Sequence, residues 1–179
     1  LIFLIDTLYF AFGYSVESKS LNNKIRSIEP TALGWVVALI CYPPFNSMFT
    51  RYTNWHADIY ILLSNSITTF IIKILILTLF LFYISATLSL GTKCSNLTNR
   101  GIITRGPYSI VRHPAYISKN IAWWIAIIPI ISWTTAISMF IWSSLYHLRA
   151  ITEERHLSQD PEYLRYCKKV KYKYIPYIY

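Results

Sequence analysis

The chain has 179 residues, of which 54% are hydrophobic and 17% aromatic, and its mean hydropathy is +0.38. An ordinary soluble domain is less apolar, so the composition predicts an integral membrane protein with a single domain, residues 1–179. The net charge of +9 does not indicate nucleic-acid binding, because the basic residues lie between apolar segments. Topology and anionic lipids account for them better.

The three cysteines lie at positions 41, 94 and 167, without the spacing of a disulfide framework or a zinc site. We therefore expect no structural metal. The chain opens inside an apolar run, residues 1–14, which lacks the basic start and small residues of a signal peptide. This run predicts a first, shortened membrane helix.

A polar loop, residues 15–30, precedes a second predicted span at residues 33–49. Pro43 and Pro44 interrupt that span, and two missing backbone donors must kink or end a helix there. The next apolar run, residues 59–90, exceeds the roughly 20 residues that cross the hydrocarbon core. The polar patch at residues 64–66 predicts a break before the true span at 67–90.

Residues 115–131 and 133–148 are the last two apolar runs, joined by a short turn, and they predict an antiparallel helical hairpin. We therefore expect an all-α, polytopic membrane bundle of about five transmembrane helices. Residues 1–90 would form its N-terminal membrane part. Residues 91–179 would form the cofactor-binding and catalytic part, with a cytosolic C-terminal segment.

The distribution of Lys and Arg predicts the orientation. Residues 15–30 hold three, residues 50–58 hold one, residues 91–113 hold four, and residues 149–179 hold seven. With three single crossings and a final hairpin, the three basic regions share one side of the membrane. The positive-inside rule makes that side the cytoplasm.

The last segment, residues 154–179, is polar, basic and aromatic. One interpretation is a juxtamembrane amphipathic tail whose Lys and Tyr residues lie at the headgroup level. The alternative is a lid over a functional site.

Ionisable residues beside the membrane helices indicate a functional site, because such groups are costly at that depth. The stretch 101–116, GIITRGPYSIVRHPAY, is one such segment. A structural interpretation is available: Pro114 suits a first helical residue, His113 a cap, and Arg112 a positive flank.

A second polar cluster, RAITEERHL, begins at residue 149. Tyr146, Arg149 and Glu153 are spaced i, i+3 and i+7 and so share one helical face. The simpler alternatives are that Arg149 pairs with Glu153 on the helix surface, and that Glu153 and Glu154 lie on a solvated face.

Taken in order, GPY-x3-RHP-x-Y, the apolar hairpin, R-x3-EE, EYLRYCKKV and the late Ile-Pro resemble the isoprenylcysteine carboxyl methyltransferase family. The resemblance covers residues 101–176. It implies a membrane enzyme that binds S-adenosylmethionine between the last hairpin and the cytosolic tail. The implied cofactor contacts are Arg100, Gly101, Ile102, Ile103, Tyr108, His113, Pro114, Ala115, Tyr116 and Glu153. The resemblance further implies that Arg149 faces the substrate carboxylate, with Arg112 as a second candidate.

The chemistry of these residues agrees with that cofactor. The Glu153 carboxylate suits an ammonium and a sulfonium. His113, Arg112 or backbone N–H groups at the helix start could receive the cofactor carboxylate. The site implies an amphiphilic small-molecule or lipidated acceptor and contact with membrane lipids. A carboxylate acceptor needs no general base, whereas an amine or thiol acceptor stays an alternative.

Two other functions remain open from sequence. The tail YCKKVKYKYIPYIY also resembles that of the membrane sterol reductases, which use NADPH. Against this stand the short chain and the paired glutamates following RHP. A membrane adaptor without enzymatic activity is the third class. Binding of the methyl donor, of NADPH, or of neither separates the three.

Overall fold

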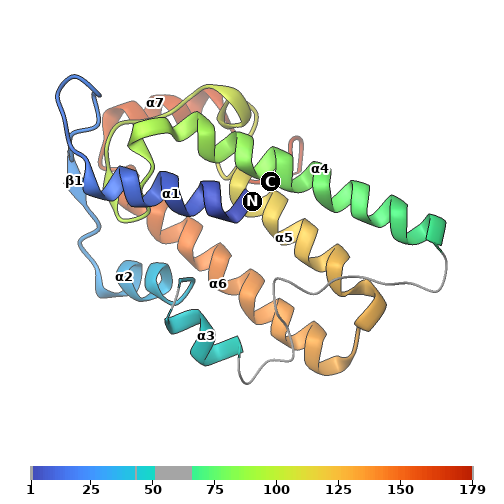
Figure 1. The fold of residues 1–179 in the computed structure, drawn as a ribbon. Coiled ribbons are helices and arrows are strands. Elements are labelled where there is room, and N and C mark those ends of the chain that lie inside the picture. The colour runs from blue at the N-terminus through green and yellow to red at the C-terminus, as the bar shows by residue number, and fades with distance from the viewer. Residues whose placement is uncertain (1, 43, 51–65, 179) are drawn as a thin grey trace.

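The computed structural model describes residues 2–42, 44–50 and 66–178. Figure 1 shows long helices packed side by side, with a shorter helix and irregular chain gathered at one end of the bundle. The protein is mostly helical, as the composition predicts. The basic segments that the sequence assigns to one side of the membrane meet at this end.

Helices α1 (Ile2–Ser15) and α4 (Ser66–Leu90) lie against each other, and both carry exposed large apolar side chains. The 25 residues of α4 span about 37 Å at the usual helical rise, enough to cross a hydrocarbon core of about 30 Å. Among the described residues, Ser66–Lys93 is the stretch with the length and apolar composition of a membrane crossing. The start at Ser66 agrees with the predicted break, of which residues 64 and 65 lie outside the described ranges.

The predicted interruption of the second apolar run, residues 33–49, at the double proline is confirmed, and the run forms two short helices in place of one span. The structure divides it into α2 (Ala32–Leu39) and α3 (Phe45–Thr50). The first ends before the double proline and the second begins directly after Pro44, because two prolines deprive a helix of two donors. At eight and six residues, neither piece can cross a bilayer as a straight helix.

The predicted hairpin is confirmed as α5 (Pro114–Ile127), a short 3-10 turn η3 (Ile128–Ile130) and α6 (Trp133–Leu157). Ser132 begins α6 with a capping box: its side chain accepts from the Thr135 N–H, and the Thr135 side chain accepts from the Ser132 N–H. Residues of both helices, including Trp123, Ile127, Met139, Trp142 and Tyr146, form the core between them.

Helix α6 runs well beyond its apolar part, which ends near Leu148, and continues to Leu157. This extension carries the second polar cluster beyond the apolar part of the helix. After α4, the 3-10 turns η1 (Gly91–Lys93) and η2 (Gly106–Ser109) bound an irregular segment that returns to the start of α5.

A two-residue ladder that the sequence did not predict joins β1 (Ser27–Ile28) to β2 (Thr98–Asn99). It fixes the loop after α1 to the segment that follows α4. Asp160 extends this junction: its carboxylate accepts from Asn99 at 2.8 Å and from Arg26 at 3.1 Å. The same carboxylate caps helix α7 (Pro161–Lys169), so the ladder and α7 are held together.

The tail covers the end of the bundle instead of lying apart from it (Figure 1). The backbone N–H groups of Arg112 and His113 donate to the carbonyls of Tyr172 and Lys173, at 3.0 and 2.9 Å. From α7, the Tyr166 hydroxyl donates to the Tyr108 carbonyl at 2.7 Å. This placement supports the lid interpretation of residues 154–179.

Candidate active site

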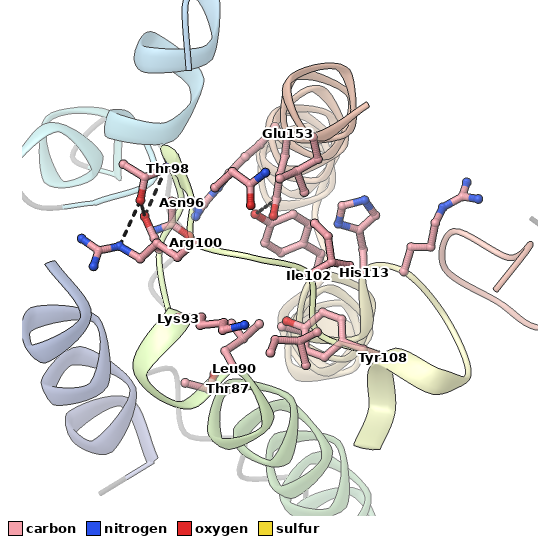
Figure 2. Close-up of a pocket in the computed structure, with 18 of the residues that line it drawn as sticks. Thr87, Leu90, Lys93, Asn96, Thr98, Arg100, Ile102, Tyr108, His113 and Glu153 are labelled. Carbon is pink, nitrogen blue, oxygen red and sulfur yellow. Dashed lines mark hydrogen bonds between the residues drawn. The ribbon is translucent and has the colours of Figure 1, made fainter. Parts of the chain in front are cut away.

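One pocket lies where α4 ends, α5 begins and α6 passes from its apolar to its polar part (Figure 2). It brings together all the predicted site residues except Pro114, which is buried at the start of α5. The predicted residues that line it are Arg100, Gly101, Ile102, Ile103, Tyr108, Arg112, His113, Ala115, Tyr116, Arg149 and Glu153. Segments far apart in the sequence thus converge on one cavity.

The end of the pocket beneath α7 is apolar and aromatic. Tyr163, Tyr166 and Val170 form a buried cluster against which Ile102 and Tyr108 pack. Burial raises the pKa of Tyr163 well above its usual value, so this phenol stays protonated. Its hydroxyl oxygen is buried and has no hydrogen-bond partner in the described part of the chain. Such an unsatisfied group at a pocket wall suits a polar ligand atom.

Glu153 supplies a carboxylate to the middle of the pocket. The Tyr116 hydroxyl donates to its Oε2 at 2.8 Å, from one turn into α5. Within the described ranges, Oε1 of Glu153 accepts no hydrogen bond. Figure 2 shows Glu153, Ile102 and Tyr108 around one open centre, with His113 beside them. The carboxylate is therefore oriented by the protein and still able to accept from a ligand.

The neighbouring Glu154 belongs to a different arrangement, which we call the Glu154 clamp: Glu154, Arg112, His113 and Lys173. The carboxylate of Glu154 lies 2.9 Å from the Arg112 Nε, 3.1 Å from the His113 Nε2 and 3.0 Å from the Lys173 Nζ. Burial opposes the ionisation of Glu154, but hydrogen bonds and charge from His113, Lys173 and Arg112 outweigh it and lower its pKa to about 2. The clamp joins the RHP segment, α6 and the tail.

The clamp explains where the polar ends of Arg112 and His113 point. Arg112 also donates to the Lys171 carbonyl at 3.0 Å, which occupies more of its guanidinium. The His113 ring stacks on Tyr116 at 5.3 Å between centroids. His113 is the N-cap residue of α5, as predicted, but its side chain makes no capping hydrogen bond. Both residues thus border the pocket while their polar ends contact Glu154, and Arg112 also holds the tail.

Arg100 lines the pocket, but its guanidinium points away from Ile102 and Glu153 (Figure 2). It is 4% exposed and donates to the Asn23 carbonyl at 3.0 Å and to the Thr98 hydroxyl at 3.2 Å. Its charge therefore stabilises the loop after α1. Gly101 follows with a φ of 101°, a conformation that side chains rarely adopt, and a Cβ there would lie 2.8 Å from the Lys93 Nζ.

Arg149 lies deeper, one turn of α6 before Glu153. It is 3% exposed, and its Nη2 donates to the Tyr42 hydroxyl at 3.2 Å. Its guanidinium carbon lies 5.1 and 5.2 Å from the ring centroids of Tyr42 and Tyr116. The Nε is buried and has no partner in the described ranges, and no ion pair within 4 Å joins Arg149 to Glu153. The simple surface pair is therefore not formed, and the cation can receive an anion.

Several residues that line the pocket lie outside the recognised motifs and were not predicted from the sequence. Tyr83 lines the pocket from α4, Lys93 from the turn after α4, Lys119 from α5, and Tyr163 and Tyr166 from α7. A signal for Lys119 was present, since an ionisable residue inside an apolar helix indicates function. No comparable signal marks the tyrosines, because aromatic residues are common both in cores and at membrane interfaces.

A model of the isoprenylcysteine carboxyl methyltransferase (ICMT) family matches residues 66–159, just over half of the chain. The chain belongs to the ICMT family. No curated protein matched the chain. The matched range runs from the start of α4 through the hairpin and the extension of α6 that carries Arg149 and Glu153. Membership of this family supports a membrane methyltransferase of the ICMT type.

Proposed function

We propose that this ICMT-family protein transfers a methyl group from S-adenosylmethionine to the carboxylate of an amphiphilic acceptor. One observation carries the proposal: a carboxylate with an open oxygen, Glu153, and a buried guanidinium with an open Nε, Arg149, line one pocket from adjacent turns of α6. The two opposite charges match a cationic methyl donor and an anionic acceptor.

The residues at the pocket fit the cofactor. Glu153 would accept from its ammonium, because it is already held by Tyr116 and has an unused oxygen. The orphaned hydroxyl of Tyr163 offers a donor at the aromatic end. Ile102 and Tyr108 provide apolar and aromatic surface for its adenosine. No Gly-rich dinucleotide fingerprint is present in the sequence, which disfavours NADPH.

The cofactor supplies an electrophilic methyl group on sulfur, and its transfer forms a C–O bond as the C–S bond breaks, leaving a neutral thioether and an ester. The chain's own residues have to position the acceptor and shield the reacting groups from water. Arg149 would hold the acceptor as a carboxylate and aim one oxygen. No side chain needs to remove a proton, because the nucleophile is already ionised. The rings of Tyr42, Tyr116 and Tyr146 around Arg149 exclude water from that position.

The placement of the pocket supports an acceptor that arrives from the membrane. Its deeper wall comes from α4, α5 and α6, and the exposed side chains of α4 are largely apolar. An amphiphile of isoprenylcysteine type could keep its chain among the helices and its head near Arg149. We further propose a multi-pass arrangement in which the pocket opens toward the cytoplasm, where the basic segments lie.

The first experiment measures ligand binding in detergent by calorimetry. S-adenosylmethionine and S-adenosylhomocysteine should both bind, and NADPH should not. NADPH binding without binding of either adenosyl ligand would overturn the proposed function in favour of a reductase. Binding of neither would favour an adaptor.

The second experiment identifies the acceptor group. Labelled methyl donor is incubated with the protein and a total membrane extract, and the product is treated with base. Label released as methanol marks a carboxyl ester, whereas base-stable label marks an N- or S-methyl product and contradicts the carboxylate. Arg149→Lys keeps the charge but loses the planar fork, so it should lower turnover about tenfold with cofactor affinity unchanged.

A further inference from the structure

Lys119 is a cation at the membrane-depth end of the pocket that none of the family's motifs contains. It lies on α5, three residues after Tyr116, so both side chains project from one helical face. Its Nζ lies among four aromatic rings, 4.8 Å from the centroid of Trp123, 5.3 Å from Phe3, 5.4 Å from Tyr83 and 5.6 Å from Tyr146. Cation–π contacts of this kind hold an ammonium in place.

Lys119 and Arg149 approach the pocket from facing helices and share one ring. The guanidinium carbon of Arg149 lies 5.9 Å from the Tyr146 centroid. Within the described ranges, neither cation has a carboxylate within 4 Å. Asp6 is the buried acid of this region, and it accepts from the Thr87 hydroxyl at 2.8 Å. Among the described residues, two cations face one acid at this end of the pocket, and Glu153 lies one turn of α6 away toward its middle, so this end is positive.

An excess of positive charge at this depth is costly unless an anion completes it. The aromatic box would otherwise suit a cationic ligand, since such boxes recognise ammonium groups. Here the protein's own lysine fills the box. An amine head group would therefore meet two cations and a box already filled by the Lys119 ammonium, whereas an anionic head group meets two partners.

We propose that Lys119 is a specificity-determining residue that binds the anionic head of the acceptor together with Arg149 and rejects amine acceptors. This inference rests on the proposed function, because it concerns the acceptor end of the same pocket. It adds a second cation to the acceptor contacts and assigns the choice between anionic and cationic amphiphiles to that residue.

The test uses three matched amphiphiles that differ in head group: N-acetyl-S-farnesylcysteine, its carboxamide, and S-farnesylcysteamine. Their affinities are measured by calorimetry in detergent with S-adenosylhomocysteine at saturation. The parent protein should bind the carboxylate at least about tenfold more tightly than either of the others. Lys119→Met should reduce the preference for carboxylate over carboxamide by about tenfold, and Lys119→Arg should keep most of it.

Lys73→Met is the matched control, because Lys73 is exposed on α4, outside the pocket lining. It should keep the full preference. An unchanged preference in Lys119→Met, with S-adenosylhomocysteine still bound, overturns the role of Lys119 and leaves the proposed function standing. If Lys119→Met does not fold, the parent protein still decides: S-farnesylcysteamine binding as tightly as the carboxylate overturns the inference. Failure of the parent to bind S-adenosylhomocysteine counts against the proposed function itself.

Discussion

The Glu154 clamp and the pocket beside it share one helix, but they differ in how completely their polar groups are paired. In the clamp, Glu154 has three basic partners, and Arg112 also donates to a tail carbonyl. In the pocket, Glu153 has one partner, and in the described ranges the Arg149 Nε and the Tyr163 hydroxyl have none. Complete pairing stabilises a fold, whereas incomplete pairing at a pocket wall leaves groups for a ligand.

Removing the clamp carboxylate should have the largest effect. Glu154→Ala removes the carboxylate that Arg112 and Lys173 share in a largely buried position, so the protein should lose about 3 kcal/mol of unfolding free energy. Denaturation in detergent measures this. Glu162→Ala is the control, because Glu162 is 45% exposed on its side chain and pairs with Arg26 at the surface. This variant should lose at most about 1 kcal/mol of unfolding free energy. Equal losses in both variants would show that the clamp stabilises the fold no more than a surface ion pair does.

Acid should weaken the same clamp. The pKa of Glu154 falls from a usual 4.5 to about 2 in the folded protein, so its contribution is complete above the unfolded value. That contribution is lost as the pH falls from about 4.5 through about 2. The unfolding midpoint of the parent should therefore drop more steeply over this window than that of Glu154→Gln. Parallel curves of unfolding midpoint against pH in the two proteins would show that carboxylates other than Glu154 cause the loss of stability in acid.

Glu153→Gln should separate binding from stability. The variant keeps the shape of the side chain and loses its charge, so S-adenosylhomocysteine should bind about 1.5–3 kcal/mol more weakly. Its unfolding free energy should change little. Glu154→Gln is the matched comparison, since it points about 100° away around the helix and should mainly affect stability. Unchanged ligand affinity in Glu153→Gln would show that the Glu153 carboxylate does not bind the ligand and is only solvated.

The smallest effect is expected for Tyr116→Phe. The hydroxyl holds Glu153 at 2.8 Å, and its loss should weaken ligand binding by about 0.5–1.5 kcal/mol. Because the two residues act through one carboxylate, Tyr116→Phe combined with Glu153→Gln should cost less than the sum of the single changes. Strict additivity in calorimetry would show that the hydrogen bond does not position Glu153.

Sequence patterns predicted the parts of the fold that local chemistry controls. Apolar length and the turn at Ser132 predicted the hairpin, and polar residues before Ile67 predicted where α4 begins. The double proline was seen correctly as an interruption, but the short helices on either side were not. The β1–β2 ladder was missed because its two-residue strands carry too little periodicity to stand out.

The candidate site was predictable where residues lie in one motif, and less so where partners come from distant segments. The shared face of Arg149 and Glu153 follows from helical spacing alone. The different roles of Glu153 and Glu154 do not follow from helical spacing, because they depend on the contacts of Glu154 with Arg112 and Lys173. A solvated face for both glutamates is the alternative that the sequence allows, because the contacts of the tail with Glu154 and Arg112 cannot be seen in it.

The position of Lys173 also gives the enzyme a defined order of completion. A chain emerges from the ribosome with its N-terminus first, so the α5–α6 hairpin is synthesised before α7 and the residues that follow it. Until Lys173 and its neighbouring carbonyls arrive, Arg112 and Glu154 have only each other and His113, and the aromatic end of the pocket is uncovered. The site can therefore be completed only after the α5–α6 hairpin, α7 and the residues around Lys173 have all been synthesised.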